Sequence, residues 1–229
     1  MSSHHVVKDF QEPALLIANG EYCSSDLLDQ LLGWSPVVVA LDDAFPRLVS
    51  LGKKVDYWLG DFDFINPEEF VAKSGQDQVR IIHRTDQEIT DFEKGILFLI
   101  DLGVKTIHIA WATGRRLDHL LSNLHVLSKY KDSVQLILFD DYGKSYFLPT
   151  FFEKWYPKGT ILSLIPLSQA EKVQTKGLVY PLAKEDLNWN SKISTSNEAQ
   201  KDGFVSIQHT SGNLLLIEAT DLKIRSREK

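Results

Sequence analysis

The sequence is poor in several features that would each support a class of function. Cys23 is its only cysteine, which excludes an internal disulfide and argues against a cysteine-based metal site. No apolar run approaches the length of a membrane span. The net charge of −6 argues against nucleic-acid binding, because such proteins need basic patches. We therefore expect no nucleic-acid partner, no membrane partner and a reducing, cytoplasmic location.

Common site signatures are also absent. The chain contains no G-x-x-x-x-G-K-[ST] loop, no G-x-G-x-x-G, no G-x-S-x-G and no H-E-x-x-H. Residues 1–10 lack the apolar core of a secretory signal. If a nucleotide binds, a metal ion, lysine and arginine must hold its phosphates in place of a glycine-rich loop.

Hydrophobic patterning predicts two domains. Over 14–140, short apolar runs such as 37–41 alternate with helical leucine spacing, which indicates a Rossmann-like α/β domain with a mainly parallel sheet. After Pro149 the pattern changes to short β-rich runs punctuated by glycine, without a helical stripe. This favours an all-β sandwich. The predicted domains are 1–149 and 150–229.

Two carboxylates follow the apolar run that ends at Gly60. In an extended backbone, Asp61 and Asp63 would point to the same side. Two acids held together repel unless a cation or a shared proton relieves them. Mg²⁺ binds carboxylate oxygens and commonly keeps phosphate as a further ligand. A solvated turn explains this pair equally simply when it is taken alone.

Other polar residues also follow predicted strands: Asn19, Asp42 and the segment 86–91. Ligands of open α/β sheets bind beyond the carboxyl ends of the strands, so these side chains are expected in one crevice. For Asp42, a role in a turn or helix cap is an equal alternative.

Two predicted helices begin with an unusual charge. Thr90 and Glu93 have capping-box spacing, so we expect Glu93 to reach back to the amide of Thr90. Lys94 then lies in the first turn, and a later helix starts after Arg115 and Arg116. Cations at a helix start oppose its dipole, which favours an external anion such as phosphate as their partner.

The residues that follow these arginines leave alternatives open. Asp118 could pair with one of the arginines or join a metal cluster. His119 could bind substrate, although a histidine at a helix start is more often a structural hydrogen bonder.

Six segments, taken in order, resemble the signatures of the thiamine pyrophosphokinases. The resemblance covers most of the chain and implies an N-terminal domain that binds ATP and Mg²⁺ and a C-terminal sandwich that binds thiamine. It also implies a homodimer with sites shared between subunits. The activity implied is transfer of a pyrophosphoryl group from ATP to the thiamine hydroxyl, which gives thiamine diphosphate and AMP. The matching segments are 18–21, 60–63, 86–94, 114–119 with Asn123, 177–182 and 194–198.

By this resemblance, residues of this chain take three kinds of role. The catalytic acids are Asp61, Asp63, Asp86, Asp91 and Asp118, and Asp61, Asp63 and Asp91 among them are metal ligands. The residues for ATP and its phosphates are Asn19, Asp42, Lys94, Arg116 and His119, and those for thiamine are Tyr180, Ser196 and Asn197.

The chain departs from the family pattern at a few positions. Phe64 stands where serine is usual, and Arg115 replaces a second glycine before Arg116. Asp43 and Phe45 stand in a stretch that is usually richer in glycine and ends in asparagine. Two other functions remain open on the residues alone. One is another Mg²⁺-dependent nucleotide-using transferase or phosphohydrolase, and the other is a non-catalytic sensor of thiamine or nucleotide.

Overall fold

The computed structural model describes residues 12–35, 37–63 and 65–220. Residues 1–10, which were predicted to contain no secretory signal, and Phe64, which differs from the family pattern, lie outside the described residues. The chain forms two compact units, 1–138 and 139–229. The sequence placed the boundary near Pro149. Strand β7 (Gly143–Phe147) precedes that proline but pairs with β13 (Ser211–Ala219) of the second unit, and the division accordingly falls earlier.

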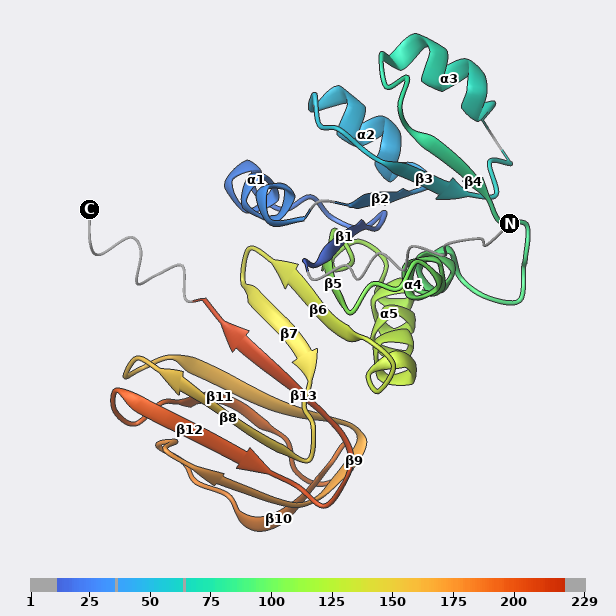
Figure 1. Cartoon of the computed structure of the whole chain (residues 1–229). Helices are drawn as coiled ribbons and strands as arrows, with labels where there is room; N and C mark the ends of the chain where they lie inside the picture. Colours follow the sequence, from blue (N-terminus) through green and yellow to red (C-terminus); the bar gives the residue numbers. More distant parts are fainter. Residues whose placement is uncertain (1–11, 36, 64, 221–229) are drawn as a thin grey trace, which may run out of the picture. The chain divides into compact units, whose positions relative to one another are not determined.

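The first unit has the expected α/β organisation (Figure 1). Its strands pair in the order β4-β3-β2-β1-β5-β6, and each described pair is parallel. The strands are β1 (Ala14–Ile17), β2 (Val38–Leu41), β3 (Tyr57–Gly60), β4 (Arg80–His83), β5 (Thr106–Ala110) and β6 (Gln135–Asp140). The helices are α1 (Ser25–Trp34), α2 (Ala44–Ser50), α3 (Pro67–Ser74), α4 (Asp91–Asp101) and α5 (Leu117–Tyr130). None of the helices in the described part of the chain is long and apolar enough to span a membrane.

The strand order reverses at β1. The chain continues from β1 through β2, β3 and β4 on one side, and β5 and β6 lie on the other. The apolar residues of β1 and β2 are fully buried, as their continuous hydrophobic runs predict. A reversal of this kind opens a crevice at the carboxyl ends of the strands. The loops after β1, β2 and β5 therefore meet at one place.

Helix α4 lies very close to the sheet. It buries Phe92, Ile96 and Leu99. A Cβ atom at Gly95 would lie 2.9 Å from Leu16 Cδ1 and 2.9 Å from Leu41 Cδ2. Glycine at this position therefore lets the helix backbone approach β1 and β2.

The start of α4 was predicted correctly in one respect and wrongly in another. Thr90 is the N-cap, and its Oγ1 accepts the amide of Glu93 at 3.3 Å. The Glu93 carboxylate does not return to Thr90. It accepts from Lys129 Nζ at 2.7 Å and from the Tyr130 hydroxyl at 2.6 Å, both at the end of α5. Burial opposes ionisation of Glu93, but these hydrogen bonds outweigh it and lower its pKa.

The second unit is all-β, as expected, and its described pairs are antiparallel. The described strand pairs of the chain are consequently mixed, because those of the first unit are parallel and those of the second are antiparallel. The long β9 pairs with four other strands and helps to enclose one hydrophobic core. The strands, besides β7 and β13, are β8 (Phe151–Tyr156), β9 (Ile161–Lys176), β10 (Ala183–Asn188), β11 (Ser194–Glu198) and β12 (Gly203–Gln208).

A mostly buried carboxylate links several strands of this unit. Glu218 on β13 accepts from Lys154 Nζ at 2.8 and 2.7 Å, from the Tyr156 hydroxyl at 2.9 Å and from the Tyr146 hydroxyl. Burial opposes its ionisation, but the hydrogen bonds, with Lys154 first among them, outweigh burial and lower the pKa of Glu218. The carboxylate is therefore ionised and fully partnered inside the unit.

Candidate active site

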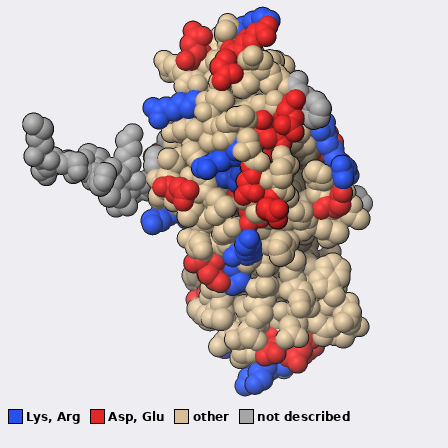
Figure 2. Space-filling view, turned by 90° about the vertical axis from the view of Figure 1, so that its right-hand side faces the viewer, with Lys and Arg blue, Asp and Glu red and all other residues tan. Residues whose placement is uncertain are grey.

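A cavity of about 670 Å³ lies within the first unit, which is within the size range of small-molecule sites. Residues from the ends of β1, β2 and β3 and from the starts of α4 and α5 line it. Figure 2 shows the face toward which β3 and β4 point in Figure 1, and acidic and basic side chains lie side by side there. The cavity is thus where the strand reversal predicts a ligand site.

Four aspartates from four separate segments line this cavity: Asp42, Asp61, Asp91 and Asp118. Burial, a hydrogen bond to the Asp91 carboxyl group and the charges of Asp91, Asp61 and Asp43 together raise the pKa of Asp42 to about 8. Asp42 therefore keeps its proton at neutral pH, next to the Asp91 carboxyl group. Retention of a proton is one way in which crowded carboxyl groups avoid mutual repulsion.

This donor set suits one type of metal ion. Among the described residues, no three His, Cys, Asp or Glu side chains are grouped closely enough to hold a metal by themselves. Mg²⁺ does not need such a cage, because it commonly uses one or two carboxylates and completes its shell with water and substrate phosphates. The adjacent Asp42 and Asp91 carboxyl groups, with Asp61 beside them, fit that requirement.

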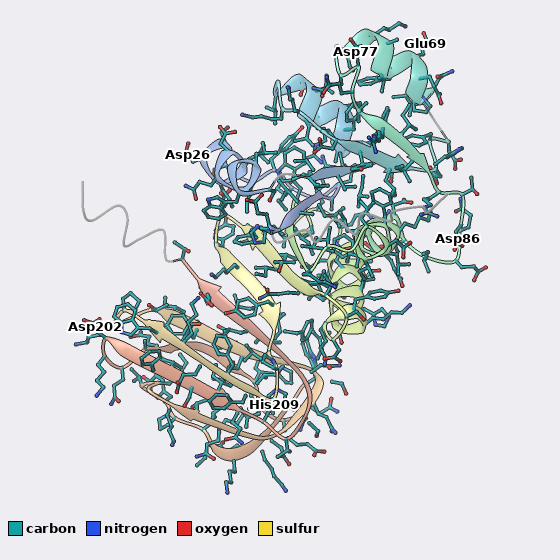
Figure 3. The ribbon with its side chains drawn as sticks, viewed as in Figure 1. Asp26, Glu69, Asp77, Asp86, Asp202 and His209 are labelled. Atoms are coloured by element: carbon teal, nitrogen blue, oxygen red, sulfur yellow. The ribbon has the colours of Figure 1, made fainter. Side chains whose placement is uncertain are left out.

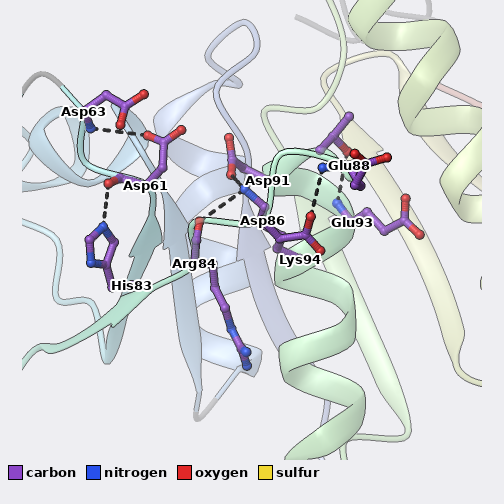
Figure 4. Close-up of polar contacts among 10 residues, drawn as sticks. Asp61, Asp63, His83, Arg84, Asp86, Glu88, Asp91, Glu93 and Lys94 are labelled. Carbon is purple, nitrogen blue, oxygen red and sulfur yellow. Dashed lines mark hydrogen bonds and ion pairs between the residues drawn. The ribbon is translucent and has the colours of Figure 1, made fainter.

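The Asp61–Asp63 pair does not have the extended geometry that the sequence suggested. Phe62 has a φ of 57°, a left-handed conformation in which side chains two residues apart do not follow the strand alternation. The Asp63 amide donates to Asp61 Oδ1 at 3.4 Å, and His83 Nε2 lies 2.6 Å from the Asp61 carbonyl oxygen (Figure 4). Asp61 lines the cavity, whereas Asp63 is exposed and is not among its lining residues.

Asp86 is likewise outside the cavity lining. It lies on the exposed loop between β4 and α4 (Figure 3), where its Oδ1 accepts the Glu88 amide at 2.8 Å. The next residues of this loop, Gln87 and Glu88, do line the cavity. The sequence prediction did not include them among the site residues, although both lie in the family-like segment 86–94.

Lys94 is a buried cation in the cavity wall. Its side chain is only 4% exposed, and Nζ donates to Asp91 Oδ1 at 2.8 Å and to the Arg84 carbonyl oxygen at 3.2 Å (Figure 4). The lysine stem reaches back over the helix start, as its position in the first turn predicts.

The two arginines before α5 differ in their partners. Arg116 binds Asp118 with both ends of its guanidinium, at 3.1 and 2.5 Å. This hydrogen bonding lowers the pKa of Asp118 to about 2. Arg115 also lines the cavity, with a φ of 52°, and donates to the Asn19 carbonyl oxygen at 3.3 Å. The prediction had not included Arg115 among the ATP-binding residues.

The remaining candidates of the first unit, Asn19 and His119, line the same cavity. The buried Asn123 supports its wall, because its amide nitrogen donates to the Ala112 carbonyl oxygen at 2.9 Å. The structure thus brings together Asn19, Asp42, Asp61, Asp91, Lys94, Arg116, Asp118 and His119.

The thiamine candidates lie close together in the second unit. Asn197 is 2% exposed, and its side chain accepts the Tyr180 amide at 3.1 Å and donates to the Tyr180 carbonyl oxygen at 2.7 Å. It therefore holds the backbone of Tyr180, whose own side chain is 69% exposed. The neighbouring Ser196 is exposed and has a φ of 52°.

Comparison with known families covers both units. A family model described as the catalytic domain of thiamin pyrophosphokinase matches residues 28–138. A second, described as the vitamin B1 binding domain of the same enzyme, matches residues 152–214. The chain belongs to the thiamine pyrophosphokinase family.

Individual members of the thiamine pyrophosphokinase family are distant relatives. Thiamine pyrophosphokinase 1 of Oryza sativa subsp. japonica is 26% identical over 194 residues, which cover 79% of this chain and 72% of the relative. The Bacillus subtilis enzyme is 27% identical over 168 residues, or 71% of this chain and 77% of the relative. The structure of thiamin pyrophosphokinase from Candida albicans superposes with a TM-score of 0.79 at 17% identity, covering 92% of this chain and 90% of that one. This last likeness establishes the fold.

The two thiamine pyrophosphokinase matches divide the candidate residues. The catalytic-domain match contains the four cavity aspartates, Lys94 and both arginines, and the B1-binding match contains Tyr180, Ser196 and Asn197. Asn19 precedes the first match, so its place in the site rests on the cavity geometry.

Proposed function

We propose that this chain is a thiamine pyrophosphokinase that transfers the pyrophosphoryl group of ATP to the hydroxyl of thiamine. The observation that carries the proposal is the cavity at the sheet reversal, where three cations and four aspartates from separate segments line one space. Such a site can hold a triphosphate without a glycine-rich loop. The match to both domains of the family supports the choice of substrates.

The reaction forms one bond and breaks one. The thiamine hydroxyl oxygen attacks the β-phosphorus, the bond from that phosphorus to the α,β-bridging oxygen breaks, and AMP leaves. The hydroxyl proton passes to a carboxylate or to solvent. This chemistry mainly requires positioning and neutralisation of charge.

The residues divide this work by their position. Lys94, Arg116 and His119 would bind phosphate oxygens, with Asn19 and Asp42 beside them at the strand ends. Mg²⁺, held by Asp61, Asp63 and Asp91, would supply neutralisation of the phosphate charge. Asp63 would need to turn from its exposed position to take part. Asp86, on the loop that borders the cavity, is proposed to join the site by closure of that loop.

The cavity aspartates are the candidates for orienting the thiamine hydroxyl or accepting its proton. Asp118 is held ionised by Arg116, and the low pKa that results makes it a weak base. The raised pKa of Asp42 makes it a stronger base than Asp118, and a cation bound beside it would lower that pKa. The pH dependence of kcat identifies the acceptor, because it reports the pKa of the group that receives the proton.

The second unit is proposed to bind thiamine through Tyr180, Ser196 and Asn197. An exposed aromatic ring can stack on a flat cationic heterocycle, and Asn197 holds the backbone that carries Tyr180. We assign binding of ATP and Mg²⁺ to the first unit, which holds the parallel strand pairs, and binding of thiamine to the all-β second unit. A homodimer with shared sites and a cytoplasmic location complete the proposal.

The decisive experiment is product analysis. Incubation with ATP, Mg²⁺ and thiamine should give AMP and thiamine diphosphate in equal amounts by mass spectrometry. Free phosphate or a nucleoside diphosphate would instead indicate a phosphohydrolase or another transferase. Binding of both ligands without turnover would indicate a sensor.

Substitution of Asp63 separates site from fold. Asp63→Ala should abolish AMP formation and leave thermal unfolding unchanged, since the side chain is exposed. A well-folded variant with near-normal AMP production would remove Asp63 from the mechanism.

Analytical ultracentrifugation tests whether the chain forms the proposed homodimer.

A further inference from the structure

An arginine behind the cavity has an unusual environment. Arg47 lies on α2, and its guanidinium carbon is 3.8 Å from the centre of the Tyr22 ring and 4.5 Å from the centre of the Trp111 ring. The two rings meet edge to face, with their centroids 4.7 Å apart. Stacking against aromatic faces is favourable for the planar guanidinium and is not reproduced by the ammonium of lysine.

Arg47 holds the turn that follows β1. Its Nη1 donates to Asn19 Oδ1 at 3.0 Å and to the Gly20 carbonyl oxygen at 2.9 Å. Asn19 and Gly20 line the cavity, whereas Arg47 is not among its lining residues. Any effect of Arg47 on a ligand in the cavity therefore passes through this turn.

The hydrogen bond from Arg47 also fixes which atom Asn19 presents. With Oδ1 accepting from Arg47, the amide nitrogen of Asn19 is the polar atom left to meet a ligand. One of its two hydrogens points to Asp43 Oδ2, at a long distance of 3.4 Å. The other can donate to an oxygen atom of a phosphate or a ribose.

The same turn is held from its other side. The Gly20 amide donates to the Trp111 carbonyl oxygen at 2.5 Å, and the Glu21 amide donates to the Thr113 carbonyl oxygen at 2.9 Å. A Cβ atom on Gly20 would collide with the carbonyl oxygens of Trp111 and Thr113. Trp111 itself is 1% exposed and has a φ of 56°, a conformation that a bulky residue keeps only when its surroundings impose it.

Holding the turn with Arg47 has a cost in free energy, because part of its guanidinium is buried without hydrogen-bond partners among the described residues. Its Nε and Nη2 atoms are buried and have no hydrogen-bond partner in the part of the chain that the structure describes. No carboxylate of the described residues forms an ion pair with it. Burial of unpaired donors costs free energy, which indicates that the arrangement has a role beyond stability.

We propose that Arg47 is a positioning residue for the nucleotide: by stacking on Tyr22 and Trp111 it orients the Asn19 amide as a donor into the cavity. The inference rests on the proposed function, because it assigns ATP to this cavity. It predicts that Arg47 acts through Asn19 and that its geometry matters as well as its charge.

Substitutions of Arg47 separate these effects. Arg47→Gln should raise the Kd for Mg²⁺-ATP about tenfold, the size expected for loss of charged hydrogen bonds. The KM for ATP should rise in step, with kcat and the KM for thiamine changing less than about twofold. Arg47→Lys keeps the charge but loses the planar stack, and we expect little rescue. Arg80→Gln is the matched control, since Arg80 lies over the Tyr57 ring and is not among the cavity-lining residues.

Two further measurements make the test decisive. In an Asn19→Ala background, Arg47→Gln should add less than about twofold to the Kd, because residues that act as one unit are not additive. Hydrogen exchange at the Gly20 and Glu21 amides should be faster in Arg47→Gln than in wild type or in Arg80→Gln, and this readout needs no turnover.

The outcomes separate the two proposals. If wild type makes no AMP, the proposed function fails, and the exchange measurement still decides whether Arg47 holds the turn. Unchanged exchange and unchanged ATP affinity in Arg47→Gln would overturn the inference. Full rescue by Arg47→Lys, or additive effects with Asn19→Ala, would also overturn it. A lower melting temperature with equal changes in both KM values would reduce Arg47 to a structural role.

Discussion

Replacement of Asp42 by asparagine tests the electrostatics of the cavity. Burial, the hydrogen bond to Asp91 and the nearby carboxylates raise the pKa of Asp42 from 3.8 in the unfolded chain to about 8. The native state thus holds a proton that the unfolded state has released. Stability must therefore fall as the pH rises from about 4 to about 8, and the penalty is constant at higher pH.

The size of the effect follows from that shift. The interval from pH 5 to pH 8 lies within that shift, and at about 1.36 kcal/mol per pH unit it corresponds to about 4 kcal/mol. Because Asp42 is partly accessible to water and interacts with several neighbouring carboxyl groups, we expect about half of this, about 2 kcal/mol. Asparagine cannot ionise. Asp42→Asn should therefore melt about 6 °C above wild type at pH 8 and within about 2 °C of it at pH 5.

The assay is thermal unfolding followed by circular dichroism at several pH values, with a chelator present. Asp77→Asn is the control, because Asp77 lies on an exposed turn after α3 (Figure 3), and this variant should follow wild type. Mg²⁺ should raise the melting temperature of wild type more at pH 8 than at pH 5, where a proton competes with it. A wild-type melting temperature that is flat over this range, or an Asp42→Asn variant that falls in parallel, would refute the reasoning.

Three other substitutions have defined outcomes. Glu218→Ala should destabilise the second unit by about 3 kcal/mol in chemical denaturation, because Lys154 and two tyrosine hydroxyls lose a buried partner; a loss below about 1 kcal/mol would contradict this. Arg115→Gly should raise the KM for ATP without lowering the melting temperature, since glycine tolerates the positive φ of this position; an unchanged KM would exclude a phosphate contact. Gly20→Ala should raise the Kd for ATP about tenfold by calorimetry, because its Cβ collides with the Trp111 carbonyl and displaces the turn; equal affinity would show that the turn adapts.

Local patterns predicted the elements well. The continuous apolar runs of β1 and β2 and the Thr90 cap of α4 are properties of neighbouring residues, and the structure confirms them. The meeting of Asp42 and Asp91 near Asp61 followed from a general rule about strand ends. It could be predicted as a region, although not as a particular pair.

The errors arise where distant residues compete with local rules. Glu93 has the spacing of a capping box, but Lys129 and Tyr130 of α5 offer its buried carboxylate a stronger set of donors. The geometry of the Asp61–Asp63 pair depends on the left-handed backbone conformation of Phe62. A phenylalanine gives no sequence signal for that conformation. The role of Arg47 could not be predicted from its neighbours in the sequence, because its partners Tyr22 and Trp111 lie in other loops.

The close approach at Gly95 has a consequence for how the site could change during evolution. One missing methyl group sets the depth at which Asp91 and Lys94 sit above the sheet, since the helix that carries them rests directly on Leu16 and Leu41. A larger side chain at this point would either displace the ends of the Leu16 and Leu41 side chains or lift both charged groups together. The spacing between these two charged groups and the strand ends is thus controlled from inside the hydrophobic core, at a residue that is not among those lining the cavity.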